Sequence, residues 1–151
     1  DIVITTAGGF PKDINLYQTG KTMDNAYYAV KRGGVVILLS ECPDIYEPPE
    51  FSDWFKYGSR QEMETALRKD FAIPGWVVLK EMECGDVATF VMVTLPQNAE
   101  LVKKANMIPV STIEEALAIA KERCASEAPR YIVMPQGANT VPLLDGKVSV
   151  G

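Results

Sequence analysis

The chain has 151 residues, enough for one domain with a substantial core, and a net charge of −5, which argues against nucleic-acid binding because that usually needs a basic face. Apolar residues make up 47% of the chain and charged residues 23%, ordinary values for a soluble globular domain. No apolar run approaches the roughly 20 residues of a membrane-spanning helix, so we expect no membrane association.

Apolar runs with strand character alternate with segments of helical periodicity, the pattern of an α/β domain. In chain order we expect a strand at Ile2–Thr6, a helix from Asn15 to about Lys31, a strand at Val35–Ser40, short helices at Phe51–Tyr57 and Ser59–Lys69, an ambiguous segment at Pro74–Glu83, a strand at Ala88–Thr94, a helix at Gln97–Ala105, a strand at Ile108–Val110, a helix from Ser111 to about Cys124, and a strand at Arg130–Met134. This order predicts an open, mainly parallel sheet flanked by helices, a three-layer, Rossmann-like arrangement.

Two local features bear on the predicted helices, a possible capping box and an internal glycine. Ser111 and Glu114 have the spacing of a capping box, which would begin the last long helix. Gly20 lies inside the first helix, where glycine costs about 1 kcal/mol relative to alanine. We expect tight packing of that helix on the sheet to be the reason for this glycine.

The first strand, the loop after it and the start of the first helix are the most informative part of the chain. Gly8 and Gly9 follow the strand, where ligands of open α/β sheets usually bind and where glycine lets the backbone approach a ligand closely. In the helix, Tyr17, Gln18 and Lys21 have i, i+3 and i, i+4 spacing and can converge. A cation beside a hydroxyl and an amide suits a small carboxylate or a phosphate, and a helix start attracts anions as well.

Histidine and cysteine usage limits the chemistry. The chain has no histidine, so it cannot by itself supply an imidazole base or a histidine metal ligand, and we expect no metal site and no catalytic residue within it. Cys42, Cys84 and Cys124 lack zinc-site spacing, and reduced thiols in a cytoplasmic protein are the simplest interpretation. The chain also begins inside a predicted strand without an initiator methionine, so we interpret it as a fragment of a longer protein.

One known family matches these residues. The run GGFPKDINLYQTGKTM (8–23) resembles the opening of the C-terminal domain of nickel-dependent lactate racemase and its 2-hydroxyacid racemase relatives, where a Gly-Gly-aromatic-Pro loop precedes an Asn-(aliphatic)-Tyr-Gln-x-x-Lys helix. The resemblance continues in GGVVILLSECPD (33–44), around Trp76, and in YIVMPQGANTVPLL (131–144). It also favours a helix at 74–83, where Pro74 suits a first helical position.

The resemblance implies that residues 1–151 are the C-terminal α/β domain of a two-domain protein whose N-terminal, cofactor-binding domain is absent. The parent protein would be an isomerase that moves a hydride between C2 of a lactate-like 2-hydroxy acid and a nickel-pincer nucleotide. That cofactor would be tethered to a lysine of the N-terminal domain, whose histidines would serve as acid, base and metal ligand. The residues of this chain implied to matter are Tyr17, Gln18 and Lys21 for the substrate, and Gly8, Gly9 and Trp76 for the cofactor.

Departures from the family pattern leave the substrate open, because Ala7 replaces an Asn common before the glycines and Phe10 replaces the usual Tyr. A second interpretation is a non-catalytic anion- or nucleotide-binding α/β module, since fold alone does not fix function. The glycine run is neither G-x-G-x-x-G nor a P-loop, which argues against a self-contained dinucleotide or ATP site. By either interpretation the fragment alone would be catalytically inactive.

Overall fold

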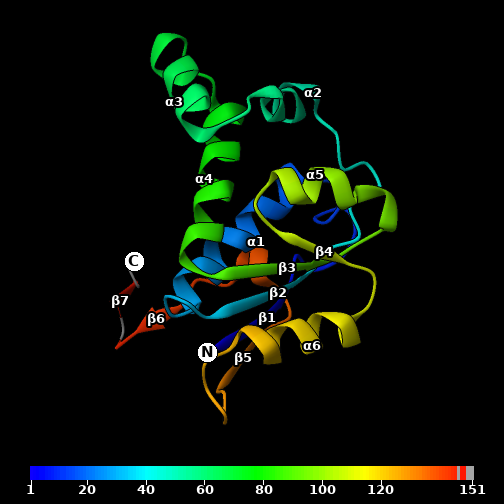
Figure 1. The fold of residues 1–151 in the computed structure, drawn as a ribbon, viewed down its shortest axis with the longest axis vertical. Helices are drawn as coiled ribbons and strands as arrows, with labels where there is room; N and C mark the ends of the chain where they lie inside the picture. Colours follow the sequence, from blue (N-terminus) through cyan, green and yellow to red (C-terminus); the bar gives the residue numbers. More distant parts are fainter. Residues whose placement is uncertain (146, 149–151) are drawn as a thin grey trace.

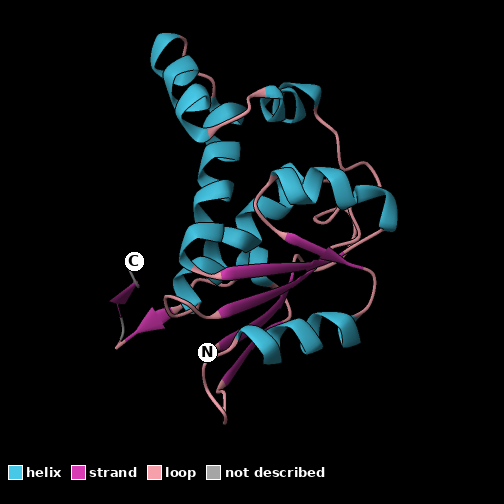
Figure 2. Ribbon diagram, in the orientation of Figure 1, coloured by secondary structure: helices cyan, strands magenta, loops and turns pink. Residues whose placement is uncertain are grey.

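A computed structural model describes residues 1–145 and 147–148 of the chain, and its central feature is a five-stranded parallel sheet (Figures 1 and 2). The strand order is β4-β3-β2-β1-β5. The strands are β1 (Ile2–Thr6), β2 (Val35–Leu39), β3 (Thr89–Val93), β4 (Ile108–Val110) and β5 (Tyr131–Met134). The predicted α/β class with a parallel sheet is therefore confirmed.

Helices cover both faces of this sheet (Figure 2). They are α1 (Leu16–Ala29), α2 (Pro49–Ser52), α3 (Arg60–Lys69), α4 (Ile73–Val87), α5 (Ala99–Lys104) and α6 (Ile113–Arg123), with short 3-10 turns η1 (Asp53–Lys56), η2 (Pro96–Asn98) and η3 (Gly137–Asn139). The first three connections join β1 to β2, β2 to β3 and β3 to β4, and their helices α1, α4 and α5 lie on one face of the sheet. The connection through α6 runs in the opposite direction, from β4 to β5 beside β1. Because parallel crossovers are right-handed, this reversal puts α6 on the opposite face.

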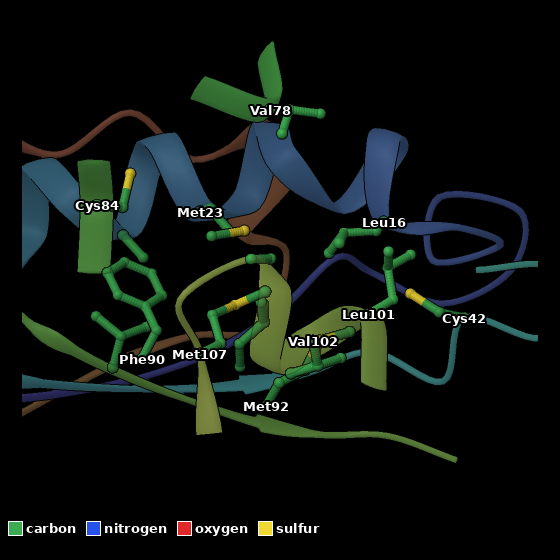
Figure 3. Packing of buried hydrophobic residues seen from close by; sticks show 14 of the residues in the cluster. Leu16, Met23, Cys42, Val78, Cys84, Phe90, Met92, Leu101, Val102 and Met107 are labelled. Atoms are coloured by element: carbon green, nitrogen blue, oxygen red, sulfur yellow. The ribbon is translucent and has the colours of Figure 1, made fainter. Parts of the chain in front are cut away.

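Successive side chains of each strand point to opposite faces of the sheet, so the core has two layers. Val36 and Leu38 of β2 point to the face of α1 and α4, whereas Val35 and Ile37 pack with Ala116 and the rest of α6. Both faces of each central strand are buried, which is why these strands read as continuous apolar runs. Figure 3 shows the larger layer, where Leu16 and Met23 of α1 lie above the strand residues Phe90 and Met92, and Val78 of α4 lies above α1.

The structure corrects three details of the sequence-based expectations. The capping box of α6 is formed by Thr112 and Glu115, not by Ser111 and Glu114, and the backbone N–H of Ser111 instead donates to the Glu115 carboxylate at 2.8 Å. Helix α1 ends at Ala29, two residues before the expected end. A short antiparallel pair, β6 (Leu143–Leu144) with β7 (Lys147–Val148), was not anticipated.

The segment around Trp76 is helical, as Pro74 and the family resemblance indicated, and α4 is longer than expected. Its buried positions, Gly75, Val78, Glu81 and Cys84, recur every three residues and face inward. Within the described residues, no helix is both long and apolar enough to cross a membrane.

Candidate functional site

The first turn of α1 is held by a side-chain cap. Asn15 precedes the helix in an extended conformation, and its carboxamide oxygen accepts a hydrogen bond from the backbone N–H of Gln18 at 2.9 Å. This satisfies one of the four N–H groups that a helix start leaves unpaired. The cap fixes the backbone that carries Tyr17 and Gln18, so the start of this helix is set by local sequence.

A pocket of about 270 Å³ lies between α1 and α4, and the predicted substrate-binding residues meet in it. The pocket is lined by Tyr17, Gln18, Gly20, Lys21 and Asp24 from α1 and by Trp76, Val77, Lys80 and Glu81 from α4. Figure 1 shows the two helices on the same side of the sheet, and their residues are in direct contact. Tyr17, Gln18 and Lys21 therefore converge as their spacing predicted, and Trp76 joins them from a helix about 60 residues away along the chain.

The α1 wall of the pocket carries an exposed cation. The ammonium of Lys21 donates to the amide oxygen of Gln18 at 3.0 Å. Because an ammonium has three donors, this contact leaves others for a ligand while it fixes the direction of the Gln18 amide. Tyr17 is steadied from outside the pocket, where its ring packs on that of Phe51 in α2 with the centroids 5.3 Å apart.

The α4 wall combines an aromatic ring with an ion pair. Trp76 is 46% exposed, and the Lys80 ammonium lies 5.4 Å from the centroid of its ring. Lys80 also donates to the Asp24 carboxylate at 2.7 Å, which ties α4 to α1. Burial opposes the charge on Lys80, but the hydrogen bond and the charge of Asp24 outweigh it and raise the pKa of this ammonium.

Glu81 is the buried residue of the same wall. Its side chain is 3% exposed, and neither carboxyl oxygen finds a hydrogen-bond partner among the described residues. Burial, and then the negative charge of Asp24, raise the pKa of Glu81 well above its ordinary value. The carboxyl lies directly beneath Gly20. The expected helix–sheet packing of Gly20 is thus wrong: the close approach that requires glycine is to the side chain of Glu81 in α4.

The glycine loop lies apart from this pocket. Gly8 and Gly9 have φ angles of 103° and 78°, which favour glycine, and both are exposed in the turn after β1. Gly9 lines a second hollow, of about 470 Å³, at the carboxyl ends of the strands. The charged residues of that lining, Asp13 and Glu41, are both acidic and do not favour an anion there. The structure therefore separates the glycines from the α1 residues, although both follow the same strand.

Sequence reasoning missed three charged residues of the pocket lining, namely Asp24, Lys80 and Glu81. Asp24 continues the α1 face three residues after Lys21, and Lys80 follows Trp76 by four, so each extends a helical face that was already singled out. This spacing is the signal that could have found them once 74–83 was taken as helix. Glu81 gave no such signal, because a charged residue on a helix is usually solvated.

Comparison with known proteins assigns the chain to a family. The sequence profile described as "Lactate racemase C-terminal domain" matches residues 1–141. The lactate racemase of Thermoanaerobacterium thermosaccharolyticum is 34% identical over 146 residues, which cover 93% of this chain and 34% of that protein. The solved structure of the lactate racemase apoprotein from the same organism superposes with a TM-score of 0.80 at 31% identity, over 93% of this chain and 35% of that one. The chain thus spans about a third of the length of these relatives, and it belongs to the lactate racemase C-terminal domain family.

Proposed function

We propose that this chain is the substrate-holding domain of a racemase that acts on a small 2-hydroxy acid such as lactate. The observation that carries the proposal is the convergence of Tyr17, Gln18 and Lys21 with Trp76 on one pocket. In this proposal Lys21 pairs with the substrate carboxylate, Gln18 directs it through an amide that can donate and accept, and Tyr17 closes the side of the pocket. Membership of the lactate racemase family supports the choice of a 2-hydroxy acid over other small anions.

The chemistry belongs to another part of the parent protein. A nickel-pincer nucleotide, the cofactor that the family resemblance implies, would supply the hydride acceptor at C2. A pocket of about 270 Å³ lies just below the roughly 300–1,000 Å³ of pockets for drug-sized ligands, so it suits a small acid, and we place the nucleotide outside it. What this chain contributes is position: a carboxylate fixed by Lys21 and Gln18 holds C2 in one place, which lowers the barrier through proximity.

An N-terminal domain of the same polypeptide is the proposed partner. The relatives are about three times as long as this chain, which leaves room for such a domain. Half-exposed Trp76 lines the pocket and offers an apolar surface for that domain, or for the cofactor it carries. Closure over the pocket would exclude water and strengthen the contact between Lys21 and the substrate. We place the parent protein in the cytoplasm, where its cysteines would stay reduced.

The test is racemisation by the full-length protein. Purified protein loaded with the nickel cofactor is incubated with D-lactate, L-lactate and longer 2-hydroxy acids, and the enantiomeric ratio is followed by chiral chromatography. We expect racemisation of at least one acid by the full-length protein and none by residues 1–151 alone. Activity in the isolated chain would overturn the assignment of the chemistry to another domain.

The second candidate, a non-catalytic anion-binding module, is favoured by one observation: the pocket supplies a cation and an amide but none of the histidines that the family mechanism needs. The same experiment separates the two candidates. Binding of a 2-hydroxy acid by the cofactor-loaded full-length protein, without racemisation of any acid tested, would favour the module.

A further inference from the structure

Glu81 is the buried ionisable group that the proposed function does not use. Both of its carboxyl oxygens are shielded from solvent and lack a hydrogen-bond partner within residues 1–145 and 147–148. Buried polar groups in folded proteins are nearly always hydrogen-bonded, so an unpartnered carboxyl calls for a physical reason. Glu81 also lines the α1–α4 pocket, so the missing partner can be a molecule that enters this pocket.

The charged neighbours of Glu81 are already engaged. On α1, Lys21 contacts Gln18, and Asp24 pairs with Lys80 of α4. The Cys84 thiol, one turn further along α4, and the Cys42 thiol are both buried and have raised pKa values, chiefly because of burial, so they bring no negative charge near neutral pH. Among the described residues, no ammonium is hydrogen-bonded to the Glu81 carboxyl, and the charge of Asp24 disfavours its ionised form.

A neutral carboxylic acid at this place is a hydrogen-bond donor. An O–H group donates to a carboxylate oxygen in one of the shorter and stronger hydrogen bonds of proteins. We propose that Glu81, as a neutral acid, is a third binding residue of this pocket, whose O–H donates to the carboxylate that Lys21 and Gln18 hold. The inference rests on the proposed function, because it takes the ligand to be a small carboxylate in this pocket.

The position of Gly20 fits this role. A methyl group at residue 20 would lie 3.3 Å from Cδ of Glu81 and would overlap Oε1, so glycine provides the space in which the carboxyl sits. Rotation about the terminal bonds of Glu81 would carry its O–H from beneath Gly20 towards the pocket. The carboxyl, which has no hydrogen-bond partner among the described residues of the free protein, would then form a hydrogen bond to the ligand. Because this bond exists only in the complex, its free energy would favour binding.

The role requires binding to depend on pH. Where the free protein has an ionised Glu81, a carboxylate ligand can bind only after Glu81 takes up a proton, so affinity falls as pH rises through the pKa of this group. Glu81→Gln keeps a donor without a titratable proton, and Glu81→Leu keeps the volume without a donor. Glu83→Gln is the matched control, because Glu83 is an exposed carboxylate on the same helix that pairs with Arg60.

The experiment is calorimetric titration of the full-length protein with 2-hydroxyisobutyrate, which has no hydrogen at C2 and cannot be racemised, between pH 5.5 and 8.5. We expect Glu81→Leu to weaken binding about 10-fold or more, as for a lost hydrogen bond to a charged group. Glu81→Gln should bind within about threefold of wild type at low pH, because a donor remains. Wild type and Glu83→Gln should lose affinity as pH rises, and Glu81→Gln should not.

The outcomes separate this inference from the proposed function. If Lys21→Ala weakens binding but Glu81→Leu and the pH profile of Glu81→Gln match wild type, Glu81 has no part in binding and the inference is overturned alone. If Lys21→Ala also binds like wild type, the pocket itself is not the substrate site and the proposed function fails. Should Glu81→Leu not fold, the pH profile of Glu81→Gln decides the matter by itself.

Discussion

Gly20 of α1 and Glu81 of α4 touch so closely that a methyl group at residue 20 would overlap the Glu81 carboxyl where it lies in the structure. The contact joins a helix that carries Lys21 and Gln18 to a helix that carries Trp76 and Lys80. Both residues are fully or almost fully buried, so a change in either one alters the width of the pocket.

Gly20→Ala should change stability in opposite directions in two backgrounds. In the wild type the added methyl overpacks against Glu81, and we expect a loss of about 1–3 kcal/mol in the free energy of unfolding. In a Glu81→Ala background the obstruction is gone, and the better helix propensity of alanine should raise the free energy of unfolding by up to about 1 kcal/mol. Urea denaturation of the four proteins measures the coupling. The same sign in both backgrounds would mean that the two residues are not in contact.

Under the proposed function, Lys21→Ala should reduce the kcat/KM of the full-length protein for its 2-hydroxy acid by about 10–150-fold, the cost of losing a charge-assisted hydrogen bond of roughly 1.5–3 kcal/mol. Lys103→Ala is the control, because Lys103 is an exposed lysine in the last turn of α5, outside the pocket. Lys31 is less suitable, since its ammonium pairs with the carboxylate of Asp1. Steady-state kinetics on both variants would contradict the proposed role of Lys21 if the two were equally active.

Asn15→Ala should affect stability and ligand binding together. Loss of the cap should lower the free energy of unfolding by about 0.5–2 kcal/mol and fray the turn that carries Tyr17 and Gln18. Ser59→Ala removes the corresponding cap of α3, where the Ser59 hydroxyl accepts from the Glu62 N–H, and should cost stability without weakening binding. Denaturation curves and titrations with 2-hydroxyisobutyrate compare the two variants, and Asn15→Asp should restore both properties. Equal binding by the two alanine variants would show that the cap does not support the site.

Glu81 should make stability depend on pH. Burial, and secondarily Asp24, raise the pKa of Glu81 in the folded protein above its ordinary value of 4.5, so the folded state keeps a proton that the unfolded state releases as pH rises past 4.5. The free energy of unfolding should therefore fall with rising pH through the window between the two pKa values, by at most about 1.4 kcal/mol per pH unit. Glu81→Gln should lose this dependence, and Glu83→Gln should keep it. Urea denaturation of all three proteins between pH 5 and 8 measures it, and parallel pH profiles for wild type and Glu81→Gln would contradict the raised pKa.

The sequence predicted the sheet well because its central strands are buried on both faces and form continuous apolar runs. Ile2–Thr6 occurs as predicted, and so does the half-buried edge strand Ile108–Val110. Helix α4 was harder to predict, because Trp76 to Leu79 reads as a strand and because the buried stripe of the helix contains the charged residue Glu81. Helical periodicity predicts an apolar residue at a buried position such as 81, and only the tertiary structure shows that a carboxyl lies there.

The candidate site, like the fold, could be predicted from the sequence only in part. Residues of one helix, Tyr17, Gln18 and Lys21, could be grouped from their spacing, and the structure does place them together. Lys80 could be inferred only from its spacing to Trp76, and Glu81 could not be inferred at all. Both come from α4, which packs on α1 only in the folded protein. The glycine loop was grouped with Lys21 because both follow β1, but the lining face of α1 turns towards α4 and not towards the carboxyl edge of the sheet.

Strand β5 has a consequence for any work with this chain on its own. Among the described residues β5 lies at the edge of the sheet and pairs with β1 alone, and Tyr131, Ile132 and Val133 are 47%, 45% and 65% exposed. An apolar edge strand is a template for the addition of another strand, so concentrated solutions of the chain should self-associate side to side. Solubility, and not folding, would then limit crystallisation or NMR samples. A lysine in place of Val133 is the substitution to try first.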